Sequence, residues 1–143
     1  MTLFLVNVAA KDERGCLAWV TGNLARWQLN LKGFVADRAG MQLLVTDVGT
    51  LASALDEMGY SYTVDEVHEV ILEDRPGALA SLCQMLSDEG VNVITAFGIA
   101  TGQSGRVYIA VDDLDRAAPI LTAHNEGPAI VHKHMGRIAP LGR

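Results

Sequence analysis

The feature that most constrains this chain is a short motif that occurs twice, 62 residues apart. Residues 74–80 read Asp-Arg-Pro-Gly-Ala-Leu-Ala and are followed, one helix length later, by Val-Asn-Val at residues 91–93. A fainter copy reads Asp-Glu-Arg-Gly-Cys-Leu-Ala at residues 12–18 and is followed by Leu-Asn-Leu at residues 29–31. Between residues 12 and 36 this shift makes six pairs identical: Asp12/Asp74, Gly15/Gly77, Leu17/Leu79, Ala18/Ala80, Leu24/Leu86 and Asn30/Asn92. The sequence therefore predicts a unit of about seventy residues that is present twice.

Composition favours a globular, acidic, cytoplasmic protein. Half of the 143 residues are hydrophobic and a fifth are charged, which is enough apolar surface for packed cores. The net charge of −6 opposes binding to nucleic acid, and no apolar run reaches the ~20 residues that span a membrane. Residues 3–10 are interpreted as a strand and not as a signal peptide. Cys16 and Cys83, one in each half, are interpreted as reduced, buried thiols.

Each half shows the same order of predicted elements. In the second half, strands are predicted at residues 66–73, 91–99, 106–111 and 128–134, with helical faces formed by Leu79, Leu82, Cys83 and Leu86 and by Leu114, Ala117, Ala118 and Leu121. In the first half, strands are predicted at residues 3–8, 30–36, 41–46 and 60–64, with helices carrying Leu17, Val20 and Leu24 and then Leu51, Leu55 and Met58. This order predicts an α+β protein of two ferredoxin-like βαββαβ modules, at residues 1–65 and 66–143, each with an antiparallel sheet and both helices on one face.

The loop between the first strand and helix of the second module has the chemistry of a binding site for a small zwitterion. Gly77 permits a tight turn and close approach to the backbone. The N–H groups of Gly77, Ala78 and Leu79 open the helix and can donate to a carboxylate. Asp74 can receive an ammonium group, and the Asn92 amide offers a donor and an acceptor. A purely structural interpretation stays open for each residue, in which Asp74 caps the helix, Gly77 turns the chain and Asn92 satisfies strand-end backbone.

The two motifs, in this setting, resemble the ACT domain family, the small ligand-sensing modules attached to many enzymes of amino-acid metabolism. Two copies cover nearly the whole chain, which looks most like the stand-alone tandem ACT proteins that have no catalytic domain. The resemblance implies pockets between two modules, with the second strand lining the opposite side through Phe97, Gly98 and Ile99 and through their counterparts Val35, Ala36 and Asp37. It also implies side-by-side pairing of sheets.

The predicted ligand-binding residues lie in both copies. They are Asp74, Arg75, Pro76, Gly77, Ala78, Leu79, Asn92 and Val93 in the second copy, and Asp12, Glu13, Arg14, Gly15, Cys16, Leu17, Asn30 and Leu31 in the first. The first copy departs from the family pattern, because Arg14 replaces the proline and Cys16 replaces Ala78. His132 and His134 alternate on a predicted strand, but no third ligand at metal spacing accompanies them, and no metal, cofactor or catalytic residue is predicted.

The leading function is therefore a noncatalytic sensor that binds a small molecule, with an amino acid as the expected ligand, and that regulates an enzyme or its own assembly. A homodimer is expected, with pairing of the two repeats inside one chain as the alternative. A small enzyme of acylphosphatase type has the same topology, but Asp74 and Pro76 do not suit a phosphate cradle. An RNA-binding module needs exposed aromatic residues on its central strands and a basic face, which this acidic chain lacks.

Overall fold

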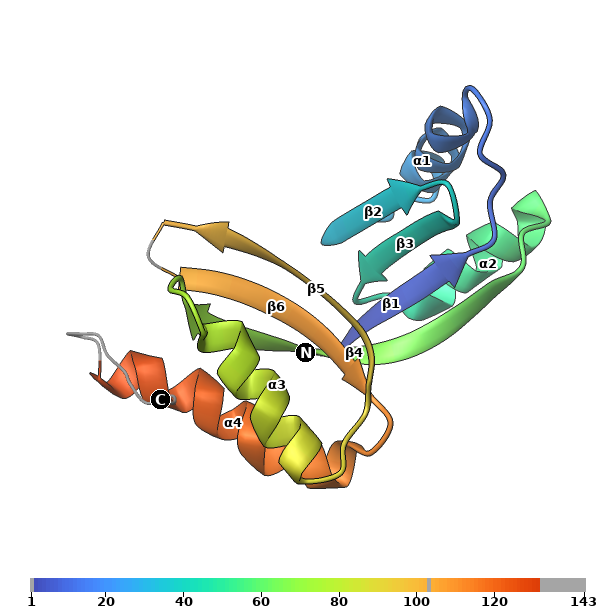
Figure 1. Cartoon of the computed structure of the whole chain (residues 1–143). Helices are drawn as coiled ribbons and strands as arrows, with labels where there is room; N and C mark the ends of the chain where they lie inside the picture. Colours follow the sequence, from blue (N-terminus) through green and yellow to red (C-terminus); the bar gives the residue numbers. More distant parts are fainter. Residues whose placement is uncertain (1, 103, 132–143) are drawn as a thin grey trace. The chain divides into compact units, whose positions relative to one another are not determined.

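The chain divides into two compact units, residues 1–66 (unit 1) and 67–143 (unit 2). The computed structural model describes residues 2–102 and 104–131 (Figure 1). The elements, in order, are β1 (Leu3–Val8), α1 (Cys16–Arg26), β2 (Gly33–Asp37), β3 (Gly40–Val45), α2 (Val48–Met58), β4 (Tyr62–Glu73), α3 (Ala78–Asp88), β5 (Val93–Thr101), β6 (Ser104–Val111) and α4 (Leu114–Val131). β4 crosses the boundary, so its first residues belong to unit 1 and its last to unit 2. No helix within these described ranges is long and apolar enough to span a membrane.

Unit 1 is a βαββαβ module with the strand order β2-β3-β1-β4. β1 pairs antiparallel with β3, from Phe4 opposite Val45 to Val8 opposite Met41. Alternate residues of these strands point to one face, where α1 and α2 lie side by side and cover them (Figure 1). The resulting core consists of Val6, Val8, Val20, Leu24, Met41, Leu43, Val45, Leu51, Ala54 and Leu55.

Unit 2 repeats this arrangement with three strands in the order β4-β6-β5, all antiparallel, and with α3 and α4 on one face. Its core consists of Val70, Leu72, Ala78, Leu82, Leu86, Val91, Ile109, Ala117 and Leu121. The predicted α+β class, with ferredoxin-like modules, antiparallel sheets and helices on one face, is confirmed.

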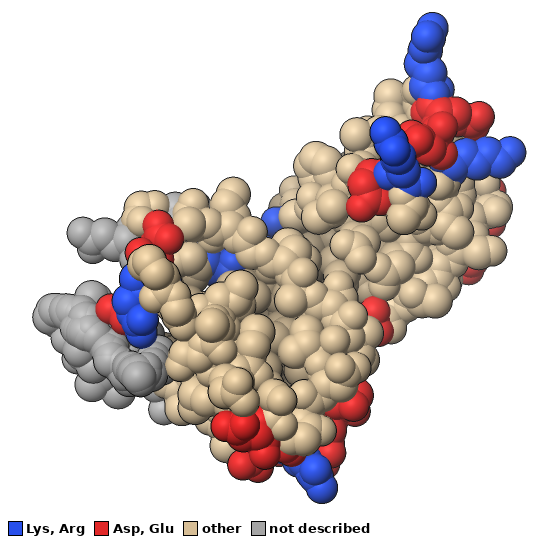
Figure 2. All heavy atoms as spheres, viewed as in Figure 1, with Lys and Arg blue, Asp and Glu red and all other residues tan. Residues whose placement is uncertain are grey.

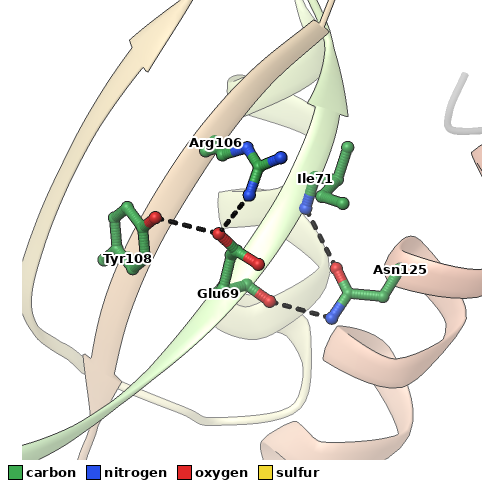
Figure 3. A network of polar contacts seen from close by, with 5 residues as sticks. All are labelled: Glu69, Ile71, Arg106, Tyr108 and Asn125. Atoms are coloured by element: carbon green, nitrogen blue, oxygen red, sulfur yellow. Dashed lines mark hydrogen bonds and ion pairs between the residues drawn. The ribbon is translucent and has the colours of Figure 1, made fainter. Parts of the chain in front are cut away.

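The last strand predicted for the second half, at residues 128–134, is wrong over the residues that the structure describes. Residues 128–131 continue α4, and the remainder, including His132 and His134, lies outside the described residues. The free edge of β4 in unit 2 is instead satisfied by a side chain of α4 (Figure 3). Asn125 accepts a hydrogen bond from the Ile71 N–H at 2.9 Å and donates one to the Glu69 carbonyl oxygen at 2.8 Å. One amide group therefore replaces two bonds that a neighbouring strand would make.

The buried face of α3 also differs from the predicted one. Leu82 and Leu86 are buried as expected, but Leu79 is 51% exposed and Cys83 is exposed, so the thiol is not the buried group that the sequence suggested. Ala78 joins Leu82 and Leu86 as the third buried residue of α3. Leu17, the counterpart of Leu79 in α1, is likewise 39% exposed. The two matching leucines are therefore outside the core in both units.

The backbone repeats along with the sequence. Gly15 and Gly77 precede α1 and α3 with φ of 84° and 90°, a left-handed conformation that favours glycine. After each helix, a second left-handed residue turns the chain: Gly90 with φ 75° in unit 2, and Gln28 with φ 55° in unit 1. The Leu29 N–H and Val91 N–H then bond the Leu24 and Leu86 carbonyl oxygens.

Candidate functional site

Unit 2 contains a cavity of about 390 Å³ between the loop that precedes α3 and the β5–β6 hairpin. This volume falls within the ~300–1,000 Å³ typical of small-molecule sites. The cavity, called here the unit 2 cavity, is lined by Leu72, Glu73, Asp74, Arg75, Ala78, Leu79, Ala96, Phe97, Gly98, Ile99, Ala100, Gly105, Arg106 and Val107.

The loop side of the unit 2 cavity is shaped by the turn that starts α3. The Arg75 N–H donates to the Glu73 carbonyl oxygen at 3.0 Å, and the Ala78 N–H donates to the Arg75 carbonyl oxygen at 3.3 Å. One of the three N–H groups expected to face a ligand is therefore used inside the turn. No side chain caps the start of α3, so Asp74 does not have the capping role that was left open for it. The Arg75 Nε lies 2.9 Å from the Glu73 carboxylate at the rim of the cavity.

The opposite side is built by the register of the hairpin, where Gly98 lies opposite Val107 and Ile99 opposite Arg106. A Cβ on Gly98 would lie 2.9 Å from the Arg106 carbonyl oxygen, so only glycine fits this close approach. Ile99 is 66% exposed, an apolar side chain at the mouth of the cavity.

A polar network fixes the strands beside this hairpin (Figure 3). The Glu69 carboxylate accepts from Arg106 Nη1 and from the Tyr108 hydroxyl, both at 2.9 Å. Partial burial, followed by the hydrogen bond to Glu69, raises the pKa of Tyr108 above its ordinary value. The Tyr108 ring stacks on Phe97, with ring centroids 5.2 Å apart. These contacts hold Arg106 and Phe97 where they line the cavity.

Unit 1 contains the equivalent cavity, of about 290 Å³, called here the unit 1 cavity. It is lined by Ala10, Lys11, Asp12, Glu13, Cys16, Leu17, Ala36, Asp37, Arg38, Gly40 and Met41. Adding 62 to the first nine numbers gives nine residues that line the unit 2 cavity. The other two match through the sheet register, because Met41 lies opposite Ala36 as Val107 lies opposite Gly98, and Gly40 lies opposite Asp37 as Arg106 lies opposite Ile99. The two cavities are the same structural feature formed twice.

The chemistry of the two cavities differs at the matched positions. Asp12/Asp74 and Leu17/Leu79 are identical in the two cavities, whereas Lys11/Glu73 and Glu13/Arg75 reverse the charge. On the strand side the change is larger, because Asp37 and Arg38 of unit 1 are replaced by Ile99 and Ala100 in unit 2. Figure 2 shows side chains of both charges gathered at the end of unit 1 near α1.

Cys16 gives the unit 1 cavity a thiol where unit 2 has Ala78. Its Sγ lies 3.7 Å from the Tyr60 hydroxyl. The hydrogen bond with Cys16 is the main cause, and burial the second, of a Tyr60 pKa above its ordinary value. The thiol therefore lies between the start of α1 and Tyr60, in the turn between α2 and β4.

The structure brings together part of the predicted site. Asp74, Arg75, Ala78 and Leu79 meet the expected Phe97, Gly98 and Ile99, and Asp12, Glu13, Cys16 and Leu17 meet the expected Ala36 and Asp37. Nine predicted residues do not line the two cavities: Pro76, Gly77, Asn92, Val93, Arg14, Gly15, Asn30, Leu31 and Val35. Asn92 instead ends the loop before β5, where its N–H donates to the Asp112 carboxylate at 2.9 Å and its carbonyl accepts from the Asp112 N–H at 3.0 Å.

Several lining residues were missed. They are Leu72, Glu73, Ala96, Ala100, Gly105, Arg106 and Val107 in unit 2, and Ala10, Lys11, Arg38, Gly40 and Met41 in unit 1. Glu73 and Lys11 directly precede the motif, so the repeat itself could have pointed to them. Arg106 and Val107 line the cavity because the hairpin register places them opposite Ile99 and Gly98, and no sequence pattern indicated this register.

Val35 lines a third cavity, of about 420 Å³, in unit 1. Asn7 also lines it and links two neighbouring strands, since its Oδ1 accepts from Gln42 Nε2 at 2.8 Å and its Nδ2 donates to Asp65 at 3.1 Å. No group of three metal-binding side chains occurs among the residues described in either unit.

A comparison with known protein families finds a match within unit 2. Residues 69–126 match the ACT domain, which confirms the resemblance for unit 2. Protein BT0572 from Bacteroides thetaiotaomicron has a similar structure, with a TM-score of 0.69, 26% identity, and coverage of 85% of this chain and 88% of that one. No curated protein matches the chain in sequence.

Two further similar structures come from aspartate kinases. The regulatory subunit of aspartate kinase from Thermus flavus has a TM-score of 0.60 at 16% identity, with 87% of this chain and 93% of that chain covered. E. coli aspartokinase III in complex with aspartate and ADP has a TM-score of 0.62 at 19% identity, covering 86% of this chain but only 31% of that one. At these identities the likeness shows the fold.

Proposed function

We propose that this chain, whose second unit contains an ACT domain, is a noncatalytic sensor that binds a free amino acid in the cavities of units 1 and 2. The observation that carries the proposal is the repetition of one cavity, formed in each unit by a strand–helix loop and the facing strand. Asp12 and Asp74 are the charged side chains that the two cavities have in common. A feature kept through the divergence of two copies is expected to have a shared use.

The loop offers complementary groups to both charges of an amino acid. The Asp74 carboxylate, which lines the unit 2 cavity and does not cap the helix, suits an ammonium group. The Leu79 N–H in the first turn of α3 and the helix dipole suit a carboxylate, since the helix begins without a side-chain cap. Asp12 and the start of α1 repeat this arrangement in unit 1.

The similar structures support the same class of ligand and an enzyme as the regulated partner. One is a regulatory subunit of aspartate kinase, and E. coli aspartokinase III is known in complex with lysine and aspartate. In this chain, binding would act by favouring one arrangement or assembly over another, which requires unequal affinity for the two states. The regulated partner is either a separate enzyme or a second copy of the chain.

A thermal-shift screen of the twenty amino acids, followed by calorimetric titration, tests the proposal. A ligand that binds the native state raises its apparent stability by mass action, by ~2.7 kcal/mol at a hundredfold excess over Kd. The Asp74→Ala, Asp12→Ala double variant is expected to lose the response. Asp88→Ala, which removes a carboxylate at the far end of α3, is the matched control and is expected to keep it. A full response in the double variant, or no response to any amino acid in the wild type, would refute the proposal.

A further inference from the structure

The two cavities share their backbone geometry but not their side chains on the strand side. Nine matched positions allow a direct comparison, and the largest differences lie on β2 and β5 and in the turn after β2. Asp37 and Arg38 place two charged residues at this side of the unit 1 cavity. Ile99 and Ala100 place two apolar residues at the same side of the unit 2 cavity.

Three of the four charged side chains that line the unit 2 cavity, Glu73, Arg75 and Arg106, are ion-paired. Arg75 is 2.9 Å from the Glu73 carboxylate, and Arg106 is 2.9 Å from the Glu69 carboxylate. Asp74 is thus the acidic side chain of the loop for which no ion pair with a neighbouring base is seen in the described part of unit 2. Away from this loop and from Arg106, the lining is formed by Leu79, Ala96, Phe97, Ile99 and other uncharged residues.

Two apolar side chains that line this cavity, Leu79 and Ile99, are exposed to solvent. Leu79 is 51% exposed and Ile99 is 66% exposed, although a β-branched residue in a strand and a leucine in an amphipathic helix are usually packed. Covering them with an apolar group removes that surface from water, which stabilises the bound state in proportion to the area. A charged ligand side chain in the same place would lose hydration, and the base opposite Ile99, Arg106, is already paired with Glu69.

We infer that the unit 2 cavity selects amino acids with an apolar side chain, that Ile99 determines this choice, and that the unit 1 cavity does not share it. The inference rests on the proposed function, since it names the ligand class of one of the two proposed sites. The ligand's ammonium and carboxylate groups lie at the loop beside Asp74, and its side chain lies against Leu79 and Ile99. Asp37, the counterpart of Ile99, opposes an apolar side chain in unit 1.

Matched exchanges at the two equivalent positions test the inference in the full chain. Leucine, valine and phenylalanine are titrated calorimetrically against aspartate and lysine, with wild type, Ile99→Asp, Ile99→Leu and Asp37→Ile. An apolar amino acid is expected to bind the wild type, Ile99→Leu and Asp37→Ile. Ile99→Asp is expected to weaken it at least about tenfold, the discrimination that a small change in an apolar pocket provides. Circular dichroism checks that each variant is folded. The Ile99 variants are expected to fold because this side chain is exposed and not part of the core.

Three results would overturn the inference, and they differ from the failure of the proposed function. If aspartate or lysine binds and the apolar amino acids do not, the ligand class is wrong while amino-acid sensing holds. If an apolar amino acid binds with unchanged Kd in Ile99→Asp, it does not lie against Ile99. If Ile99→Asp changes only the mass measured by light scattering, the exposed side chains form a protein interface. When no amino acid binds any of the four proteins, the proposed function itself fails and the inference falls with it.

Discussion

The replacement of a strand by one side chain in unit 2 gives a prediction whose size can be worked out from the structure. Asn125→Ala removes two neutral hydrogen bonds, of 2.9 Å to the Ile71 N–H and 2.8 Å to the Glu69 carbonyl oxygen. Each is worth ~0.5–1.5 kcal/mol, and because Asn125 is exposed, water can reach the released groups. We therefore expect a loss of ~1–2 kcal/mol in the free energy of unfolding, measured by urea denaturation.

A matched control separates this edge contact from ordinary surface bonding. Gln84 Nε2 donates to the Asp88 carboxylate at 2.8 Å on the exposed surface of α3. Because pairs of this kind within one helix contribute ~0.2–0.5 kcal/mol, Gln84→Ala should change stability much less than Asn125→Ala. Amide hydrogen exchange gives the direct reading, since the Ile71 amide should exchange faster in Asn125→Ala and at the wild-type rate in Gln84→Ala.

The isosteric variant Asn125→Asp sharpens the test. Its carboxylate keeps an acceptor for the Ile71 N–H but places an acceptor against the Glu69 carbonyl oxygen, so at neutral pH it should be no more stable than Asn125→Ala. Protonation of the new carboxyl supplies a donor, and its deficit relative to wild type should shrink below about pH 4. An Ile71 amide that stays equally protected in Asn125→Ala would show that another group satisfies this edge.

Four other outcomes are expected. Gln28→Gly should stabilise the chain by up to ~1 kcal/mol and Gly90→Ala should destabilise it by a similar amount, because both positions are left-handed; a destabilised Gln28→Gly or a stabilised Gly90→Ala in urea denaturation would refute this. Asp47 accepts from the backbone and side chain of the residue three positions on, which lowers its pKa below the ordinary 3.8, so Asp47→Ala should lower Tm at pH 6 but not once the pH has fallen through the lowered pKa; a pH-independent difference in Tm contradicts this. Gly77→Asp should remove the ligand response of unit 2, since it puts a carboxylate beside the helix start, and Gly15→Asp should affect the same ligand less; equal calorimetric Kd values would count against it. The chain should form a dimer, and light scattering that gives the monomer mass at every concentration would rule this out.

The parts that the sequence predicted correctly depend on local chemistry. β1 has the predicted bounds, and Gly77 lies in the tight turn that the motif indicated, with φ of 90°. The strand predicted at residues 128–134 failed because a short apolar run fits either a strand or a helix, and the contacts of Asn125 with β4 come from residues more than fifty positions away. Local periodicity carries no information on such a contact.

The candidate site was predicted on its loop side and missed on its hairpin side for a related reason. The repeat offset of 62 holds up to the turn between the second and third strands, but Met41 and Val107 match at an offset of 66. The hairpin of unit 2 is therefore longer than that of unit 1. The two repeats can no longer be aligned at one offset where the third strand supplies the residues that complete the cavity. Leu79 was assigned to the core because its spacing fits a helical face, whereas in the structure it is one of the exposed apolar residues.

The continuity of β4 across the two units affects how the chain can be cut by proteases or expressed in halves. The boundary between the units falls inside this strand, after Glu66, and not in a loop. A protease needs several residues of accessible, extended backbone, and here those residues are committed to sheet pairing on both sides of the boundary. Limited digestion should therefore trim other segments before it separates the two halves. Any attempt to express one half alone must decide which half keeps the strand, and the other half then begins or ends with an incomplete sheet.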